Sequence, residues 1–231
     1  MTQIDPRTVQ GYFNTIAGRY DVLNTVLSFG MHVVWKRRAV RSAEPVSGQR
    51  ILDLCGGTAD LALRATRACP GTRVWVYDFS RAMLAVGRTK ARAERAELAF
   101  VQGDALRLAL PDGAFDCVLI GFGLRNLADR EAGFSEIYRV LRPGGRVVCL
   151  EFSHPQAPWF ARLYRWYARH LIPVVGSVVA GARDAYAYLP ASIEAFPGPV
   201  TLAAMMTRAG FRQVSYRLLS GGIAALHLGE K

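Results

Sequence analysis

Residues 50–60 read RILDLCGGTAD, a short apolar run followed by two glycines and a threonine. The apolar run is typical of a buried strand, and the glycines permit a tight turn into a helix that we expect at about 59–69. Free N–H groups at the start of that helix can bind a ligand. No third glycine follows Gly57 as a dinucleotide fingerprint requires, and the loop lacks the Gly-Lys-Ser/Thr of a P-loop. A pyrophosphate or triphosphate ligand is therefore disfavoured.

The pattern of a strand followed by a helix repeats downstream. We expect strands at 74–78, 98–102, 116–120 and 146–152, and helices at about 80–96 and 130–141. This alternation predicts right-handed βαβ units and an α/β fold with a mostly parallel sheet covered on both faces. Ligands bind such sheets beyond the carboxyl ends of the strands.

We expect one domain over residues 1–231, since this length and a hydrophobic fraction of 51% suffice for one large core. Within it we expect an N-terminal helical cap at 1–45, a cofactor-binding core at 46–153, a substrate-side helical insertion at 154–200, and a C-terminal helix with edge strands at 201–231. The longest uncharged apolar stretch, 171–182, is too short for the roughly 20 residues that span a bilayer.

The chain is basic, with 29 Lys and Arg against 18 Asp and Glu and a net charge of +11. Such an excess favours an anionic partner, which could be nucleic acid, an acidic lipid surface or a phosphate-bearing ligand. An RNA-binding protein is one alternative, but the only tight basic cluster is at 36–38, so we expect no specific nucleic acid. The four cysteines lack metal-ligand spacing, so we expect no metal. The start of the chain has no apolar signal segment, which favours a cytoplasmic location.

Candidate ligand-binding residues follow three successive predicted strands. Gly56 belongs to the first loop, Asp78 ends the second strand, and Asp104-Ala105 follows the third. An acid at the second position can accept both ribose hydroxyls, and a carboxylate beside a backbone N–H can read an adenine edge. These groups without a phosphate cradle suit S-adenosylmethionine. Alternatively, Asp78 caps the next helix and Asp104 closes a turn.

Further segments resemble the ubiquinone/menaquinone biosynthesis C-methyltransferase family nearly end to end. They are the N-terminal stretch at 13–36, the glycine loop at 53–60, FGLRN at 122–126, RVLRPGG at 139–145, LEFS at 150–153, YLPASI at 188–193, Phe196-Pro197 and GGI at 221–223. The resemblance implies a Rossmann-like class I methyltransferase fold with a seven-stranded sheet and S-adenosylmethionine as cofactor. It places Thr58 near the methionine part, Asp78 on the ribose, and Asp104 and the Ala105 N–H on adenine. The chain departs from the family at Ala59, commonly glycine, and at Gly121, often serine.

The family's reaction is methylation of a quinol ring carbon. The resemblance implies conversion of demethylmenaquinol to menaquinol, with the benzoquinol precursor of ubiquinone as the alternative substrate. A carbon nucleophile needs an electron-rich ring, so the enzyme must orient the ring, exclude water and stabilise a phenolate. We expect Arg125 to face the phenolate and Asn126 to bind a quinol oxygen, with Tyr188 and Tyr20 lining the ring.

Other roles remain open for these residues. Arg125 could instead anchor Asp129 or Glu151, and the tyrosines could be packing residues of a lid. His154 or Asp21 could relay the proton.

The segment 156–171 is amphipathic. One helical face carries Trp159, Leu163, Trp166, Tyr167 and His170, and another carries Arg162, Arg165 and Arg169. This pattern fits a surface helix that touches an anionic bilayer to collect a lipid substrate, although such stripes more often belong to a helix packed on the sheet. The resemblance implies an isoprenoid quinol substrate, and we also expect peripheral contact with the inner face of a membrane, and a homodimer.

Overall fold

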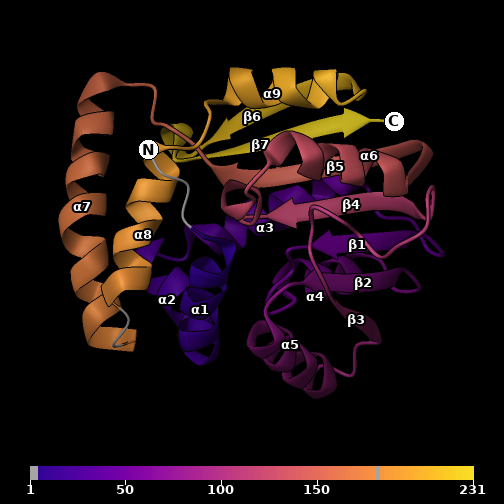
Figure 1. Ribbon diagram of the computed structural model, residues 1–231, viewed down its shortest axis with the longest axis horizontal. Coiled ribbons are helices and arrows are strands. Elements are labelled where there is room, and N and C mark those ends of the chain that lie inside the picture. Colours follow the sequence, from indigo (N-terminus) through magenta and orange to yellow (C-terminus); the bar gives the residue numbers. More distant parts are fainter. Residues whose placement is uncertain (1–4, 181–182) are drawn as a thin grey trace.

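The computed structural model describes residues 5–180 and 183–231 and contains one mixed sheet (Figure 1). Its strands are β1 (Arg50–Leu54), β2 (Arg73–Asp78), β3 (Leu98–Gln102), β4 (Phe115–Gly121), β5 (Leu141–Phe152), β6 (Arg212–Leu219) and β7 (Ala224–Glu230). They form a seven-stranded sheet in the order β3-β2-β1-β4-β5-β7-β6. The strands from β3 to β5 in this order are parallel, and β7 runs antiparallel to both β5 and β6. The expectation of a mostly parallel seven-stranded sheet is confirmed.

Strand β5 begins earlier than the sequence indicated, so the predicted start at 146 is wrong. Leu141 already pairs with Phe115, and a register shift separates this pair from the pairing of Cys117 with Arg146. The Pro-Gly-Gly turn between them stays in the sheet because the chain end holds it. The Gly144 N–H donates to the Lys231 carbonyl, and the Lys231 N–H donates to the Gly145 carbonyl, both at 2.9 Å.

Helices cover both faces of the sheet, because side chains alternate along each strand and both sets are apolar. On one face lie α3 (Met31–Ala43), α4 (Asp60–Ala68) and α5 (Arg81–Ala93), which contribute Trp35, Leu63 and Leu84 to a core cluster that also contains Leu119 of β4. On the other face lie α6 (Arg130–Val140) and α9 (Pro199–Arg208). Helix α3 falls within the predicted cap segment, yet it packs on the sheet.

Four helices lie beyond the carboxyl ends of the parallel strands (Figure 1). They are α1 (Pro6–Ile16), α2 (Tyr20–Leu27), α7 (Pro158–Ala180) and α8 (Arg183–Glu194), with the short helix η1 (Ala17–Arg19) between the first two. They share a small core of their own around Ile16, Leu23 and Ala168. We call these helices the cap; it combines helices from the predicted N-terminal segment at 1–45 with helices from the predicted insertion at 154–200.

Within the described part of the chain, no helix has both the length and the apolar composition that crossing a membrane requires.

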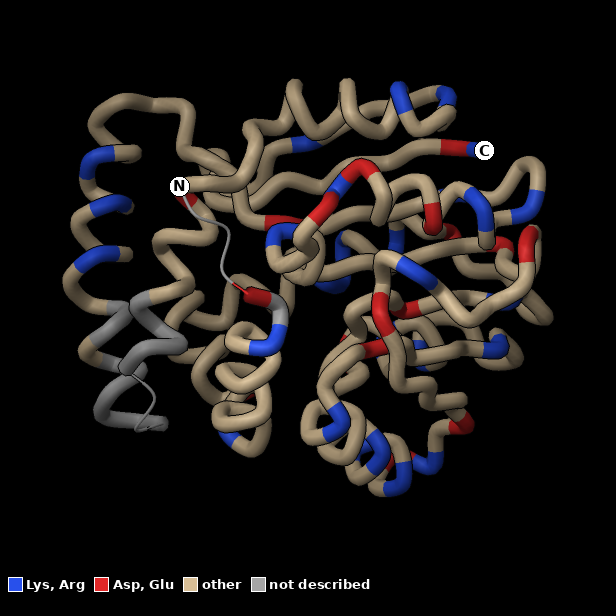
Figure 2. The backbone as a smooth tube through the Cα atoms, viewed as in Figure 1, with Lys and Arg blue, Asp and Glu red and all other residues tan. Residues whose placement is uncertain are grey.

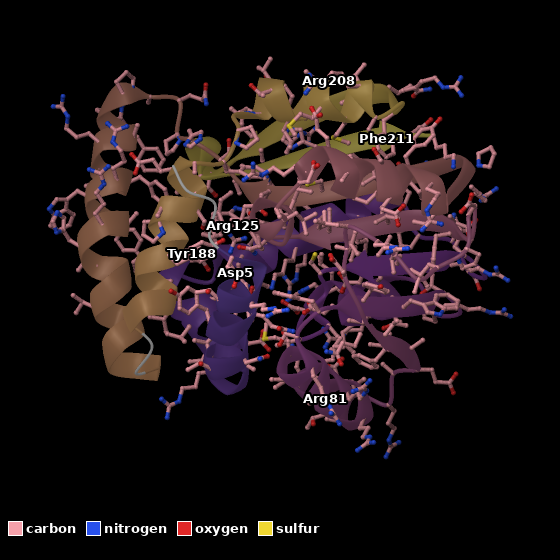
Figure 3. The ribbon with its side chains drawn as sticks, viewed as in Figure 1. Asp5, Arg81, Arg125, Tyr188, Arg208 and Phe211 are labelled. Carbon is pink, nitrogen blue, oxygen red and sulfur yellow. The ribbon has the colours of Figure 1, made fainter. Side chains whose placement is uncertain are left out.

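Phe211 tests the packing between the sheet and the helices α6 and α9. It is buried, and its ring centroid lies 5.2 Å from that of Tyr138 and 6.3 Å from that of Phe134 (Figure 3). Phe211→Ala is expected to lower the free energy of unfolding by about 3–5 kcal/mol, because the cavity cannot close fully. Urea denaturation measures the change. Phe29→Ala, which truncates an exposed ring, is the control and should change stability by less than about 0.5 kcal/mol.

Candidate active site

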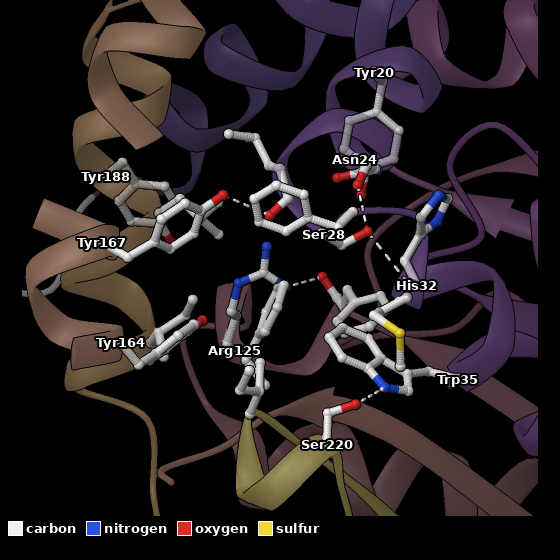
Figure 4. Close-up of a pocket in the computed structure, with 18 of the residues that line it drawn as sticks. Tyr20, Asn24, Ser28, His32, Trp35, Arg125, Tyr164, Tyr167, Tyr188 and Ser220 are labelled. Carbon is white, nitrogen blue, oxygen red and sulfur yellow. Dashed lines mark hydrogen bonds between the residues drawn. The ribbon is translucent and has the colours of Figure 1, made fainter. Parts of the chain in front are cut away.

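Two cavities meet where the cap faces the carboxyl edge of the sheet. The first, of about 220 Å³, is lined by Gly56, Thr58, Asp78, Asp104, Ala105 and Asn126, among others. The second, of about 440 Å³, is lined mainly by aromatic and aliphatic side chains and includes Arg125 and Tyr188 (Figure 4). Phe13, Tyr20, Lys36 and Phe122 line both cavities. The first is called the loop cavity below and the second the aromatic cavity.

The glycine loop needs Gly56 because the backbone folds back on itself. A Cβ at this position would lie 2.8 Å from Cγ1 of Val76 and 2.9 Å from the carbonyl oxygen of Asp53. Ala59, at the position where the resembling family commonly has glycine, adopts a left-handed φ of 64°. Its N–H still donates to the Gly56 carbonyl at 2.8 Å, so the turn is intact despite the strain.

Asp78 is buried at the end of β2 and held by backbone amides. Oδ2 accepts from the Gly57 N–H at 2.9 Å and Oδ1 accepts from the Ser80 N–H at 2.8 Å. Burial raises the pKa of Asp78 to about 6, because desolvation outweighs these hydrogen bonds. The N-cap of α5 is Ser80, whose hydroxyl accepts from the Met83 N–H. Asp78 is therefore fixed in the loop cavity without serving as the helix cap.

Asp104 closes a turn and also lines the loop cavity. Its Oδ1 accepts from the Leu106 N–H at 2.9 Å, which is the turn interaction considered from the sequence. The turn orients the loop that carries the Ala105 N–H, so both observations are compatible with an adenine site.

Asp53 is an acidic residue of this cavity to which the sequence assigned no role. Its Oδ2 accepts from the Ala62 N–H at 2.9 Å, while the buried Oδ1 has no partner among the described residues. Burial raises the pKa of Asp53 to about 7. A buried carboxylate oxygen without a partner is costly, so it fits a cationic group of a ligand. The ammonium of an amino-acid moiety, as in S-adenosylmethionine, satisfies this requirement.

Thr58 is tied to the cap. Its hydroxyl donates to Oδ1 of Asp21 at 2.8 Å, and Oδ2 of Asp21 accepts from Nζ of Lys90 at 2.7 Å. Asp21 thus joins cap helix α2 to the glycine loop and to α5. It lines neither cavity, which argues against the proton relay considered for it.

The cap is tied to the loop after β2 as well. Nε2 of Gln10 donates to the Phe79 carbonyl at 2.7 Å, and the Ser80 hydroxyl donates to Oδ1 of Asn14 at 2.6 Å. The cap therefore contacts the loops that follow both β1 and β2.

Arg125 lies in the short helix η2 (Leu124–Asn126) and pairs with Glu151, which is the second of the roles left open from the sequence. Its Nη1 lies 3.1 Å from Oε1 of Glu151 and also donates to the Phe122 carbonyl. The alternative partner, Asp129, instead caps α6 by accepting from the Ala132 N–H. Nε of Arg125 is buried and has no partner within the described structure. The guanidinium thus keeps N–H groups that neither Glu151 nor the Phe122 carbonyl takes, while the residue lines the aromatic cavity.

The three predicted catalytic residues lie together. Asn126 follows Arg125 in η2, and its Oδ1 accepts from the Tyr188 hydroxyl of α8 at 3.0 Å. Asn126 lines the loop cavity and Tyr188 lines the aromatic cavity, so this hydrogen bond joins the two. Arg125 and Tyr188 are both seen where the cap meets the sheet (Figure 3).

Other polar groups of the aromatic cavity are held in one protonation state. Burial raises the pKa of Tyr164 to about 12 and raises that of Tyr188. Burial and nearby Lys36 lower the pKa of His32 to about 4, so its imidazole is neutral at pH 7. His154, considered as a proton acceptor, lines neither cavity; its Nε2 lies 3.0 Å from the Phe196 carbonyl oxygen.

Lys36 is a second residue whose role the sequence did not indicate. It is buried, lines both cavities, and pairs with Asp60 at 2.7 Å. This pair holds the pKa of Asp60 well below its usual range against the effect of burial. The pair fixes α3 to the start of α4 beside the glycine loop.

Comparisons with known proteins agree with this geometry. A model of the ubiE/COQ5 methyltransferase family matches residues 1–231. A demethylmenaquinone methyltransferase of Thermus thermophilus is 50% identical over 219 residues, covering 95% of this chain and 99% of that protein. A ubiquinone/menaquinone biosynthesis C-methyltransferase of Methylobacterium nodulans is 47% identical, covering 96% of this chain and 90% of that protein.

Among solved structures, an S-adenosylmethionine-dependent methyltransferase of Thermotoga maritima superimposes with a TM-score of 0.68 at 18% identity. The match covers 96% of this chain and 99% of that one. It confirms the Rossmann-like class I fold.

The two raised pKa values predict how cofactor affinity depends on pH. A cationic ligand group favours ionised Asp53, and ribose hydroxyls favour ionised Asp78. The pKa values of these carboxyl groups are about 7 and about 6, so below these pH values each group must lose its proton when the cofactor binds. The affinity for S-adenosylmethionine should therefore fall as pH drops from 8 to 5.5, by up to about tenfold per pH unit for each protonated group. Calorimetric titration across this range measures it. In Asp53→Asn the fall should begin about one pH unit lower; an affinity independent of pH contradicts the assignment of both groups.

The Asp21 bridge predicts how long the cofactor site stays closed. Asp21→Asn removes the charge that holds Lys90 and weakens the bond from Thr58, so the cap should open more often. Because the ion pair is partly exposed, the expected increase in the S-adenosylhomocysteine dissociation rate is modest, about two- to fivefold. Stopped-flow fluorescence measures this rate. Asp112→Asn, which breaks an exposed pair with Arg139 away from the cavities, is the control; equal rates in both variants would contradict a bridging role.

Proposed function

Because the chain belongs to the ubiE/COQ5 methyltransferase family over its whole length, we propose that it methylates a ring carbon of demethylmenaquinol to give menaquinol. Family membership confirms the expected class of enzyme, an S-adenosylmethionine-dependent methyltransferase, and favours it over the RNA-binding alternative. The observation that carries the substrate proposal is the junction of the two cavities at Phe122. A cavity lined by carboxylates and glycines there meets an aromatic cavity that contains a buried arginine.

We propose that the loop cavity binds the cofactor. Asp53 receives the ammonium group, Thr58 lies near the methionine part, Asp78 accepts the ribose hydroxyls, and Asp104 with the Ala105 N–H binds adenine. Gly56 leaves room for this approach. When bound, the cofactor supplies an electrophilic methyl group on a cationic sulfur.

The quinol ring occupies the aromatic cavity beside Phe122. Attack of the phenolate ring carbon on the methyl group that S-adenosylmethionine would supply forms a carbon–carbon bond as the carbon–sulfur bond breaks and S-adenosylhomocysteine leaves. The resulting ketone enolises, so the ring proton moves to the oxygen, and the net proton released is the one that the quinol gave to solvent on ionisation. A guanidinium N–H of Arg125 that neither Glu151 nor the Phe122 carbonyl takes donates to the quinol oxygen and stabilises the negative charge that makes the ring a nucleophile. Asn126 and Tyr188 position the oxygen from the junction of the cavities.

The side chains of the aromatic cavity keep one protonation state near neutral pH, so the group that ionises is the hydroxyl of the quinol. Tyr164 and Tyr188 stay protonated near neutral pH, and His32 stays neutral because the imidazolium is disfavoured by burial. These groups therefore donate or accept hydrogen bonds without changing charge. The guanidinium of Arg125 lowers the cost of a phenolate, so its charge sets the pH at which the quinol ionises.

The apolar tail of the substrate places the reaction at a membrane surface. An isoprenoid quinol resides in the bilayer, so we propose peripheral contact with an anionic membrane on its cytoplasmic side. The homodimer expected from the sequence stays a prediction.

Labelled methyl transfer to chemically reduced demethylmenaquinol tests the proposal, with a ubiquinone-pathway benzoquinol as the second substrate. Arg125→Lys keeps the charge that Glu151 needs but loses the forked guanidinium donors, so kcat should fall by about 10²–10³. Tyr188→Phe removes one hydrogen bond and should cost roughly tenfold. Tyr167→Phe is the matched control, since that hydroxyl donates to the Leu27 carbonyl in the same cavity.

The outcomes separate the substrate from the mechanism. Label in the benzoquinol alone would show that the benzoquinol is the substrate, and the proposed roles of Arg125 and Tyr188 would stand. Label in neither quinol while the cofactor binds would overturn the proposed function.

A further inference from the structure

Exposed apolar side chains surround the mouth of the aromatic cavity. Phe29 in the turn between α2 and α3, and Leu163 and Trp166 of α7, line this cavity and yet are 81%, 53% and 55% exposed. Met31 shares both properties. Trp159, 73% exposed, continues the same stripe of α7, because at 100° per residue positions 159, 163 and 166 fall within about 60° of one another. We call Phe29, Met31, Trp159, Leu163 and Trp166 the apolar rim.

The fold does not need the Phe29 side chain. Its backbone has a φ of 49°, a left-handed conformation that costs an ordinary residue roughly 1 kcal/mol. Its ring lies 6.0 Å from that of Tyr167 and is otherwise open to solvent. A large aromatic side chain at a position that favours glycine indicates a role in contact with something outside the fold.

A basic stripe borders the apolar rim along α7. Arg162, Arg165 and Arg169 follow one another on this helix, and its sequence at 158–180 contains no acidic residue (Figure 2). Arg169 pairs with Glu194 at the surface. Arg162 and Arg165 have no ion pair in the portion of the chain that the structure describes, so their charges are available to an anionic partner.

We propose that the apolar rim and the basic stripe form the surface that docks on a bilayer containing anionic phospholipid. The aromatic side chains enter the headgroup region, and the arginines contact lipid phosphates. The inference that a polyprenyl tail passes through this mouth rests on the proposed function. A cavity of about 440 Å³ has the size of a site for a drug-sized ligand, so a long tail must extend out of it.

A second copy of the chain fits this surface less well. A symmetric contact would bring the same patch of each copy together, and the arginines would face arginines. A bilayer with anionic headgroups satisfies the apolar and the basic parts at once.

Cosedimentation with phosphatidylcholine vesicles, with and without phosphatidylglycerol, tests the proposal on the full chain. Wild type should bind the anionic vesicles, and binding should weaken with salt. Arg162→Gln/Arg165→Gln should reduce partitioning by roughly 30-fold, and Phe29→Ser/Trp166→Ser by about tenfold or more. The matched controls, Arg73→Gln/Arg95→Gln and Val46→Ser, alter exposed residues near the amino ends of the strands and should bind as wild type.

Failure of docking and failure of the proposed function give different results. Equal binding to both vesicle types, or losses in the controls as large as in the rim variants, would overturn the docking surface. So would a dimer in solution that Phe29→Ser/Trp166→Ser dissociates. Turnover of a short-tailed, water-soluble demethylmenaquinol should be equal in wild type and in Arg162→Gln/Arg165→Gln, whose side chains line neither cavity, whereas turnover of a vesicle-embedded long-tailed quinol should fall in that variant. No turnover of either quinol would count against the proposed function and leave the vesicle binding to decide the docking.

Discussion

Two buried carboxylates at the ends of neighbouring parallel strands constrain the whole site. Asp53 and Asp78 are removed from water with no cationic side chain of the described residues in contact, and burial raises the pKa of each. Backbone amides of the loops must therefore approach them, which requires a turn as tight as the one at Gly56. The free Oδ1 of Asp53 leaves this arrangement incomplete until a ligand arrives. Part of the binding energy of a cationic ligand is thus stored as the desolvation of these groups.

The cap extends this constraint to the second cavity. Asp21 joins α2 to Thr58 of the glycine loop, and Gln10 and Asn14 join α1 to the loop after β2. The same helices supply Phe13 and Tyr20, which line both cavities. A movement of the cofactor loops therefore reaches the wall of the aromatic cavity through direct contacts. This coupling ties the geometry of the loop cavity to that of the aromatic cavity.

Much of the architecture followed from local sequence patterns, whereas the pairings that complete the site did not. Alternating strands and helices predicted the parallel sheet, and the rule that ligands bind at strand ends brought Asp78 and Asp104 to one cavity. The early start of β5 was missed because a Pro-Gly-Gly turn normally ends pairing, and here the distant residue Lys231 keeps it in the sheet. Lys36 reads as part of an exposed basic cluster, and only the tertiary contact with Asp60 shows it to be buried. His154 illustrates the converse, since it was considered as a proton relay from the sequence, but its Nε2 lies 3.0 Å from the Phe196 carbonyl oxygen and it lines neither cavity.

The pair of Arg125 and Glu151 explains how an apolar cavity can hold a cation. An isolated guanidinium there would cost several kcal/mol in lost hydration, and the buried carboxylate offsets this cost. The resting cavity is therefore close to neutral overall and can accept an uncharged quinol with an apolar tail. In the proposed reaction, the negative charge of the phenolate is stabilised by guanidinium N–H groups that neither Glu151 nor the Phe122 carbonyl takes. Because these groups are already oriented by Glu151 and the Phe122 carbonyl, little reorganisation opposes the charge that the reaction creates.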